Sequence, residues 1–376
     1  MPYTLRDYGT MIADETRTRA YAEALRRAIR PGDVVLDLGA GTGIFSLLAC
    51  RLGARRVHAC DASAAVQVAG ELARSNGFGD RIICHEVPSE SLTLPEPVDV
   101  IVSELRGALP LHGRSVTALI DARSRLLKAG GVILPQRDRL WLALASAPDE
   151  HARAVAPWSG NDQGFDLGRW SAWLANSWIT APARASQLVS RPVLWSDLDY
   201  RRVEGPDVRS RVTCVVDRDA DVHGFFLWFD ATILDDVGFS GGPDAPKLPY
   251  GCAFFPWPRA VRANGGDTIA IDLGAALVGD DYTWTWRTVV GKTRFEQSTF
   301  FATVVSAATM RRRAASHVPD LTEEGTVTLR ALEGLRQRRP LGEIADDLLA
   351  EFSSRFAGDR QACLGFVGDL SVKYGA

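Results

Sequence analysis

The segment VVLDLGAGTG, residues 34–43, constrains the fold of this chain more than any other feature. An apolar run ends around an acidic residue, Asp37, and three alternating glycines follow: Gly39, Gly41 and Gly43. Apolar residues then recur at helical spacing, so the pattern predicts a strand, a tight turn and a helix. Glycine suits such a turn because it adopts left-handed backbone and lets a ligand approach closely.

A second apolar run, RVHACD, ends at Asp61, roughly 20 residues after the turn, where an acidic residue can accept hydrogen bonds from ribose hydroxyls. A dinucleotide site would use G-x-G-x-x-G, whereas this chain has D-x-G-x-G-x-G. The turn resembles the first motif of class I S-adenosylmethionine (SAM) methyltransferases. A dinucleotide site and a turn without a ligand are the alternatives. The resemblance implies SAM contacts at Asp37, the three glycines, Asp61 and Ala62, and at Ser89, which follows the third predicted strand.

The hydrophobic pattern changes character along the chain. Residues 34–145 alternate short apolar runs with helical stretches, which predicts a parallel sheet covered by helices. Residues 192–305 carry β-type runs broken by Gly, Pro and Asp, which predicts an antiparallel barrel or sandwich. In the last 60 residues, Thr322 is a candidate N-cap and apolar residues recur at helical spacing, which predicts three short helices.

We therefore predict an α/β chain with a doubly wound Rossmann-like SAM-binding domain, an antiparallel β-barrel domain and a small helical C-terminal module. The expected boundaries are 1–30 for an N-terminal helical segment over the SAM site, 31–145 for the Rossmann-like domain, 146–305 for the β-barrel domain and 317–376 for the module. An inserted helical arm for dimerisation is expected at about 155–180, where four tryptophans gather.

Composition excludes several classes of partner. The net charge is −3 and the isoelectric point is near 6.1, so no global basic field favours nucleic acid. The six cysteines include no C-x-x-C pair, so we expect no metal site, and Cys50, Cys60 and Cys84 are expected to be reduced core residues. The N-terminus has no apolar signal core, and no 18-residue apolar run occurs, so we expect a cytoplasmic protein without a membrane partner.

Further motifs, in order, resemble the protein arginine methyltransferases. They are Y-x-x-M-I-x-D-x-x-R-T-x-x-Y at 8–21, SEL at 103–105, LLKAGGVILP at 126–135, QGFDL at 163–167 and DATILDDVGFSGGPDAP at 230–246. The resemblance implies SAM-dependent methyl transfer, a homodimer, and an ion pair between Arg17 and the SAM carboxylate, which a bidentate guanidinium would suit. It also implies a loop in which two glutamates bracket the guanidinium of the substrate.

The chain departs from that family in its acceptor loop. Glu104 matches the first glutamate, but the second position falls at about His112–Gly113 and is not acidic. Arg106 adds positive charge beside Glu104, and LPYGCAFFPW, at 248–257, lacks the histidine of the family's Thr-His-Trp loop. These departures favour an acceptor other than arginine, on a peptide or a natural-product intermediate. A genuine arginine N-methyltransferase with a remodelled loop is the alternative.

Two residues are our candidates for the chemistry. Glu104, at the carboxyl edge of the predicted sheet, would contact the cofactor, orient the acceptor and take its proton. His112 could act as the base for an amine or hydroxyl. Tyr250 and Trp257 either line the acceptor channel or pack in the barrel core. A non-catalytic SAM-binding scaffold that binds a peptide is the alternative from another class.

The C-terminal module resembles the PqqD-like peptide-recognition domains of ribosomal-peptide biosynthesis. The resemblance is carried by L-T-E-E-G-T-x-x-L-x-x-L-E-G, P-L-G-E-I-A-D-D-L-L and G-F-V-G-D-L. It implies that the module binds a leader peptide, with a structural C-terminal cap as the alternative.

Overall fold

The chain forms two compact units, Met1–Thr303 and Val304–Ala376. The computed structural model describes residues 3–157, 164–165, 167, 170–246, 248 and 250–375. Part of the predicted arm, residues 158–163, 166 and 168–169, therefore lies outside the described residues. The finer domain boundaries within the first unit stay predictions, but residues 137–145, which the pattern assigned to the parallel sheet, lie in an antiparallel sheet.

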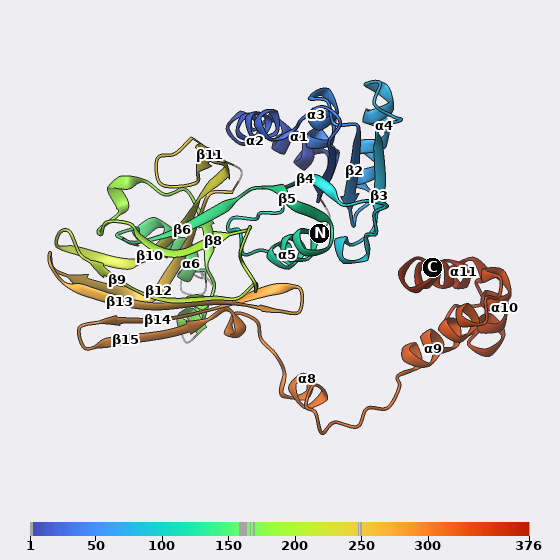
Figure 1. The fold of residues 1–376 in the computed structure, drawn as a ribbon. Helices are drawn as coiled ribbons and strands as arrows, with labels where there is room; N and C mark the ends of the chain where they lie inside the picture. Colours follow the sequence, from blue (N-terminus) through green and yellow to red (C-terminus); the bar gives the residue numbers. More distant parts are fainter. Residues whose placement is uncertain are drawn as a thin grey trace. The chain divides into compact units, whose positions relative to one another are not determined.

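A five-stranded parallel sheet forms the first part of the first unit (Figure 1). Its strand order is β3-β2-β1-β4-β5. The strands are β1 (Val34–Leu38), β2 (Arg56–Asp61), β3 (Ile82–Glu86), β4 (Val98–Ser103) and β5 (Leu127–Leu134), and the helices beside them are α3 (Ile44–Arg51), α4 (Ala65–Ser75) and α5 (Ser115–Arg125). The order reverses between β1 and β4, and open sheets of this kind bind ligands at the carboxyl ends of the strands beside that point.

Two helices precede the sheet: α1 (Leu5–Ala13) and α2 (Glu15–Ala28). Asp14 separates them and caps α2, because its carboxylate accepts from the backbone N–H groups of Thr16 and Arg17. Helix α2 buries Tyr21 and Leu25, whereas α1 buries no residue. Helix α1 is thus held by its capping box and by few tertiary contacts.

Two antiparallel sheets follow (Figure 1). One has the order β7-β12-β10-β6-β8, with β11 paired to β10, and the other has the order β15-β14-β13-β9. Their strands are β6 (Arg137–Ala145), β7 (Ile179–Ala181), β8 (Val193–Asp199), β9 (Val208–Val215), β10 (Ala220–Leu234), β11 (Val237–Ser240), β12 (Cys252–Ala263), β13 (Thr268–Val278), β14 (Asp281–Val290) and β15 (Thr293–Ser298). Alternate residues of β14 are buried, so Trp284 and Trp286 face a core shared with Phe255.

Further short helices of the first unit are η1 (Ser89–Ser91), α6 (Pro148–Val155), α7 (Ser171–Leu174), η3 (Ala185–Gln187) and η4 (Thr299–Phe301). The α/β fold class, with a parallel Rossmann-like sheet, antiparallel sheets and a helical C-terminal part, is confirmed.

The second unit is helical, with α8 (Ala307–Arg312), α9 (Glu323–Arg336), α10 (Leu341–Glu351) and α11 (Arg360–Tyr374). Thr322 caps α9 by accepting from the N–H of Gly325. The unit has its own apolar core, which includes Val327, Ile344 and Val367. The described residues 304–375 form no strand, so the β-hairpin with which PqqD-like domains begin has no counterpart there.

All six cysteines are free, and Cys50 and Cys60 are buried while Cys84 is half-buried. No helix among the described residues is long and apolar enough to span a bilayer.

Candidate cofactor and acceptor site

The glycine turn between β1 and α3 has the backbone that its sequence predicts. Gly39, Gly41 and Gly43 have φ angles of 76°, 52° and 80°, a region that other residues rarely adopt. A Cβ at Gly41 would lie 2.6 Å from the ring of Tyr8, and one at Gly39 would overlap the side chain of Leu105. The glycines therefore serve both the turn and the close approach of groups that cover it.

Asp61 ends β2 beside this turn, as predicted. Its Oδ2 atom accepts from the N–H of Gly41 at 2.9 Å, and its Oδ1 atom accepts from the N–H and the hydroxyl of Ser63 at 2.8 and 2.7 Å. These donors fix the orientation of the carboxylate. A carboxylate offers about four acceptor positions, so Asp61 keeps one for a hydroxyl donor.

Asp37 lies deeper than the cofactor prediction implies. Its side chain is 1% exposed, and its Oδ2 atom accepts from the Ser46 hydroxyl at 2.7 Å. Burial raises the pKa of Asp37 to about 6, against the hydrogen bonds from Ser46. The two cavities described below do not include it among their lining residues. Its contact with SAM stays a prediction, and in the structure it joins β1 to α3.

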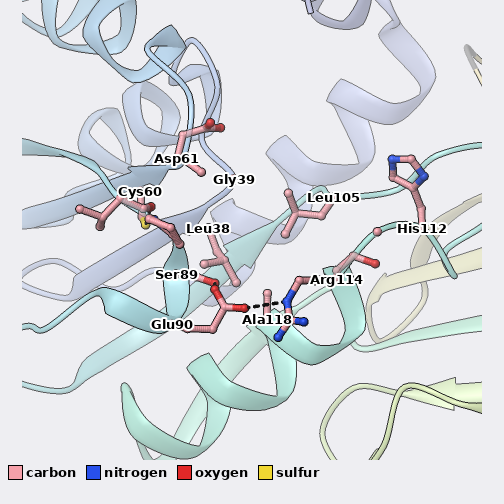
Figure 2. Close-up of a pocket in the computed structure, with 15 residues that line it drawn as sticks. Leu38, Gly39, Cys60, Asp61, Ser89, Glu90, Leu105, His112, Arg114 and Ala118 are labelled. Atoms are coloured by element: carbon pink, nitrogen blue, oxygen red, sulfur yellow. Dashed lines mark hydrogen bonds and ion pairs between the residues drawn. The ribbon is translucent and has the colours of Figure 1, made fainter. Parts of the chain in front are cut away.

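Two neighbouring cavities, of about 350 and 700 Å³, open over the glycine turn and share Gly39, Asp61, Leu105 and His112. Figure 2 shows the smaller one. The smaller cavity continues over Ala62, Ser89 and Glu90 and is mostly apolar, which suits a flat base. The larger one continues to Arg17 and Glu104. The structure thus brings every predicted cofactor residue except Asp37 and Gly43 to one pair of cavities, and a Cβ at Gly43 would instead meet Ala69 of α4.

Glu104 follows β4 and lines the larger cavity. Its side chain is 9% exposed. One oxygen, Oε2, accepts from Arg17 Nη1 at 2.5 Å, and the other, Oε1, accepts from the hydroxyl of Tyr250 at 2.6 Å. Arg17, predicted to pair with the SAM carboxylate, therefore pairs here with the candidate catalytic carboxylate.

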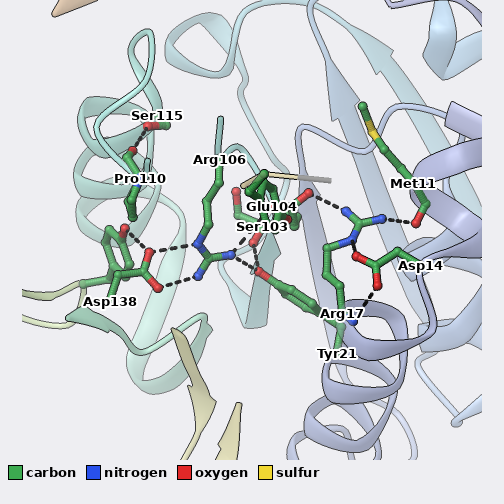
Figure 3. A network of polar contacts seen from close by, with 12 residues as sticks. Met11, Asp14, Arg17, Tyr21, Ser103, Glu104, Arg106, Pro110, Ser115 and Asp138 are labelled. Carbon is green, nitrogen blue, oxygen red and sulfur yellow. Dashed lines mark hydrogen bonds and ion pairs between the residues drawn. The ribbon is translucent and has the colours of Figure 1, made fainter. Parts of the chain in front are cut away.

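Arg106 lines part of the larger cavity, and its guanidinium enters a buried polar network (Figure 3). Its Nε and Nη2 atoms both donate to Asp138 at 2.8 Å, and its Nη1 atom donates to the hydroxyl of Tyr21 at 2.6 Å. Tyr200 donates to the same carboxylate at 2.7 Å. The positive charge that the sequence places beside Glu104 is thus neutralised by Asp138, although Arg106 Nη1 still lies 3.8 Å from Glu104 Oε1.

Of the other candidate residues, His112 lines the two cavities, whereas Trp257 is buried in the core. His112 is exposed and lines both cavities, so the structure brings it to the same site as Glu104. Trp257 is fully buried against Phe295, which agrees with core packing rather than with an acceptor channel. Sequence reasoning missed Asp138, and it gave no separate role to Tyr8, which begins the motif at 8–21. Asp138 stands between Arg137 and Arg139, just before the apolar run of β6, so the sequence around it gives no clear signal that it is buried.

The residues present fit SAM. The turn approaches a ligand through glycine, Asp61 keeps an acceptor position, and the buried Nε atom of Arg17 has no hydrogen-bond partner among the described residues. Asp61 would hold the ribose and Arg17 the carboxylate of the cofactor. SAM supplies a methyl group activated on a sulfonium centre.

Comparisons with known proteins show what this chain is similar to. A family model described as Ribosomal protein L11 methyltransferase (PrmA) matches residues 14–134. Probable protein arginine N-methyltransferase 6 of Arabidopsis thaliana is 33% identical over 245 residues, 63% of this chain and 55% of that protein. This chain therefore spans about half the length of that relative. Human protein arginine N-methyltransferase 2 is 31% identical over 298 residues, 75% of this chain and 68% of that protein.

Solved structures share the fold. The Trypanosoma brucei PRMT1 enzyme-prozyme heterotetrameric complex with AdoHcy gives a TM-score of 0.72 at 23% identity, covering 77% of this chain and 96% of that chain. Arabidopsis thaliana protein arginine methyltransferase 10 gives 0.68 at 21%, covering 78% and 97%. The fold and site define a class I SAM-dependent methyltransferase, which confirms the predicted class and cofactor. Within that class, the chain belongs to the protein arginine methyltransferase family.

Proposed function

We propose that this chain transfers the methyl group of SAM to a side chain of a peptide, or to a related natural-product intermediate. One observation carries the proposal. Glu104 and His112, the candidates for acceptor chemistry, line the same cavity as Arg17, Asp61 and the glycine turn. A site for the cofactor and groups able to orient a nucleophile and take its proton thus meet in one space.

The acceptor is proposed to be an uncharged nucleophile, such as a hydroxyl or a neutral amine. Both oxygens of Glu104 already accept hydrogen bonds, from Arg17 and Tyr250, and Arg106 lies 3.8 Å away. A guanidinium needs charge-matched, bidentate partners, and His112–Gly113 supplies no second carboxylate. In this proposal Glu104 orients the nucleophile, and Glu104 or His112 removes its proton.

An arginine nitrogen is the second candidate acceptor. It is favoured by the identity of 31% to human protein arginine N-methyltransferase 2 across 68% of that protein. Binding of SAM would offer Arg17 another carboxylate, which would release one oxygen of Glu104 for a guanidinium.

The experiment is incubation of the full chain with labelled SAM and the peptides encoded beside its gene, followed by mass spectrometry of the product. Methyl groups on oxygen or on a non-guanidinium nitrogen would support the first acceptor class, and methyl groups on arginine would support the second. Glu104→Gln should abolish most turnover and leave SAM binding intact. SAM binding without methylation of any peptide would favour the non-catalytic scaffold.

We also propose that the second unit recognises the leader part of the peptide. Two features support this role. The unit has a separate core, and a groove of about 500 Å³ lies between α9 and α10. The groove is lined by charged residues that include Arg330, Arg339 and Asp347. In the full chain, charge reversal of Arg330 and Arg339 should raise the KM for a peptide with its leader, and should leave the KM for a leaderless peptide unchanged. Equal effects on both peptides would contradict the proposal.

A further inference from the structure

Tyr250 lies beside the candidate active site without lining it. Its ring is 8% exposed, and neither cavity over the glycine turn includes it among the lining residues. Its hydroxyl nevertheless lies 2.6 Å from Glu104 Oε1, which does face the larger cavity. The contact joins residues 146 positions apart in the chain, from the loop before β12 to the end of β4.

The surroundings of Tyr250 hold its ring in one place. The ring stacks on Phe239 of β11, with centroids 6.3 Å apart and planes 9° apart, and meets the edge of Phe229 of β10 at 5.5 Å. Arg106 lies over the same two phenylalanines, at 5.6 and 5.9 Å. A hydroxyl carried on a ring packed in this way has little freedom to leave its acceptor.

In its hydrogen bond with Glu104, the hydroxyl of Tyr250 can act only as the donor. Burial and then the charge of Glu104 raise the pKa of the Tyr250 hydroxyl well above its usual range, so it keeps its proton. A hydrogen bond to a charged acceptor is stronger than one between neutral groups. The second oxygen of Glu104 is held by Arg17 from α2, so the carboxylate is fixed between a helix of the first part of the unit and the antiparallel part.

We infer that Tyr250 is a positioning residue for Glu104: it fixes the carboxylate so that the free lone pairs of its oxygens face the bound acceptor. The inference rests on the proposed methyl transfer, because it gives Glu104 its role. Tyr250 itself touches neither cofactor nor acceptor. Its contribution should therefore appear in turnover and vanish when Glu104 is changed.

The test is Tyr250→Phe, which keeps the ring and removes the hydroxyl. We expect kcat to fall about tenfold, with the dissociation constant for SAM unchanged within twofold, since Tyr250 makes no part of the cofactor cavity. Tyr282→Phe is the matched control, because Tyr282 is also buried and also donates one hydrogen bond, to the carbonyl oxygen of Pro206. The control should lose stability without losing turnover.

A double-mutant cycle separates positioning from a merely structural role. In the Glu104→Gln background, Tyr250→Phe should have no further effect on the residual kcat. Equal losses of kcat in both backgrounds, or no loss in either, would overturn the inference. The same cycle can be measured by denaturant unfolding, which needs no turnover. If the chain methylates nothing, shifts in the unfolding midpoint that are not additive between the single and double variants would still support the contact. Additive shifts would refute it.

Discussion

At the scale of single residues, Asp61 shows how one carboxylate serves both fold and ligand. Three donors from Gly41 and Ser63 set its direction, and one acceptor position remains. Removing the side chain deletes hydrogen bonds between ribose hydroxyls and a charged group, which are worth about 1.5–3 kcal/mol. We therefore expect Asp61→Ala to weaken SAM binding by about 10- to 100-fold, as measured by calorimetry. Unchanged affinity would contradict the assignment of the ribose to Asp61.

Asp37 should make stability depend on pH in the opposite way from a paired surface carboxylate. Its folded pKa of about 6 lies above the ordinary value of 3.8, so the folded state binds the proton more tightly. The stability from this group is fully present below the unfolded pKa and is lost as the pH rises through about 6. The difference of about 2 units corresponds to about 3 kcal/mol.

The variant Asp37→Asn, measured without SAM, should therefore gain unfolding free energy relative to the parent between pH 4 and pH 8. Asp99→Asn is the control of opposite sign. Asp99 accepts from Lys128 and from the N–H of Val34, and its pKa is lowered although burial opposes the shift. The contribution of Asp99 to the stability of the fold is present at high pH and is lost as the pH falls, so Asp99→Asn should be destabilising at pH 8. If the unfolding free energy relative to the parent changed with pH in the same direction in both variants, then Asp37 would be ionised in the folded state without a loss of stability.

At the scale of elements, the pair Arg106–Asp138 ties the segment after β4 to the start of β6. Asp138 is 0% exposed and Arg106 is 8% exposed. Removing one partner leaves a buried charge alone, which costs about 3–5 kcal/mol. We expect Arg106→Met and Asp138→Asn each to be strongly destabilising in denaturant unfolding. The double variant should be much more stable than the sum of the single effects predicts, and additive effects would show that the two charges do not stabilise each other.

At the scale of the whole molecule, local pattern decided what the sequence could predict. The glycine turn, the strand ending at Asp61 and the position of Glu104 after the fourth strand follow from periodicities within a few residues, and the structure has them where the pattern predicts. The hydrogen-bond partners of Glu104 and Arg106 could not be predicted from local periodicity. Tyr250 and Asp138 meet them across 146 and 32 positions, through pairings of strands that no local pattern specifies.

The homodimer predicted from the sequence stays a proposal. Four aromatic side chains gather on the first unit and are about half exposed: Trp170, Trp173, Phe300 and Phe301. Their rings touch in sequence, with centroids 5.8, 6.1 and 5.5 Å apart. Aromatic residues are enriched in the cores of interfaces, and a contiguous exposed cluster of them marks an interaction surface.

We expect the full chain to be a homodimer at micromolar concentration, and the double variant Trp173→Ser with Phe301→Ser to be a monomer, because it removes the two rings at the centre of the cluster. Sedimentation equilibrium measures both states. Val278→Ser is the control, since Val278 is 64% exposed at the end of β13 and belongs to no such cluster, and it should leave the dimer intact. A monomeric parent chain, or a double variant that remains dimeric, would exclude this surface as the dimer interface.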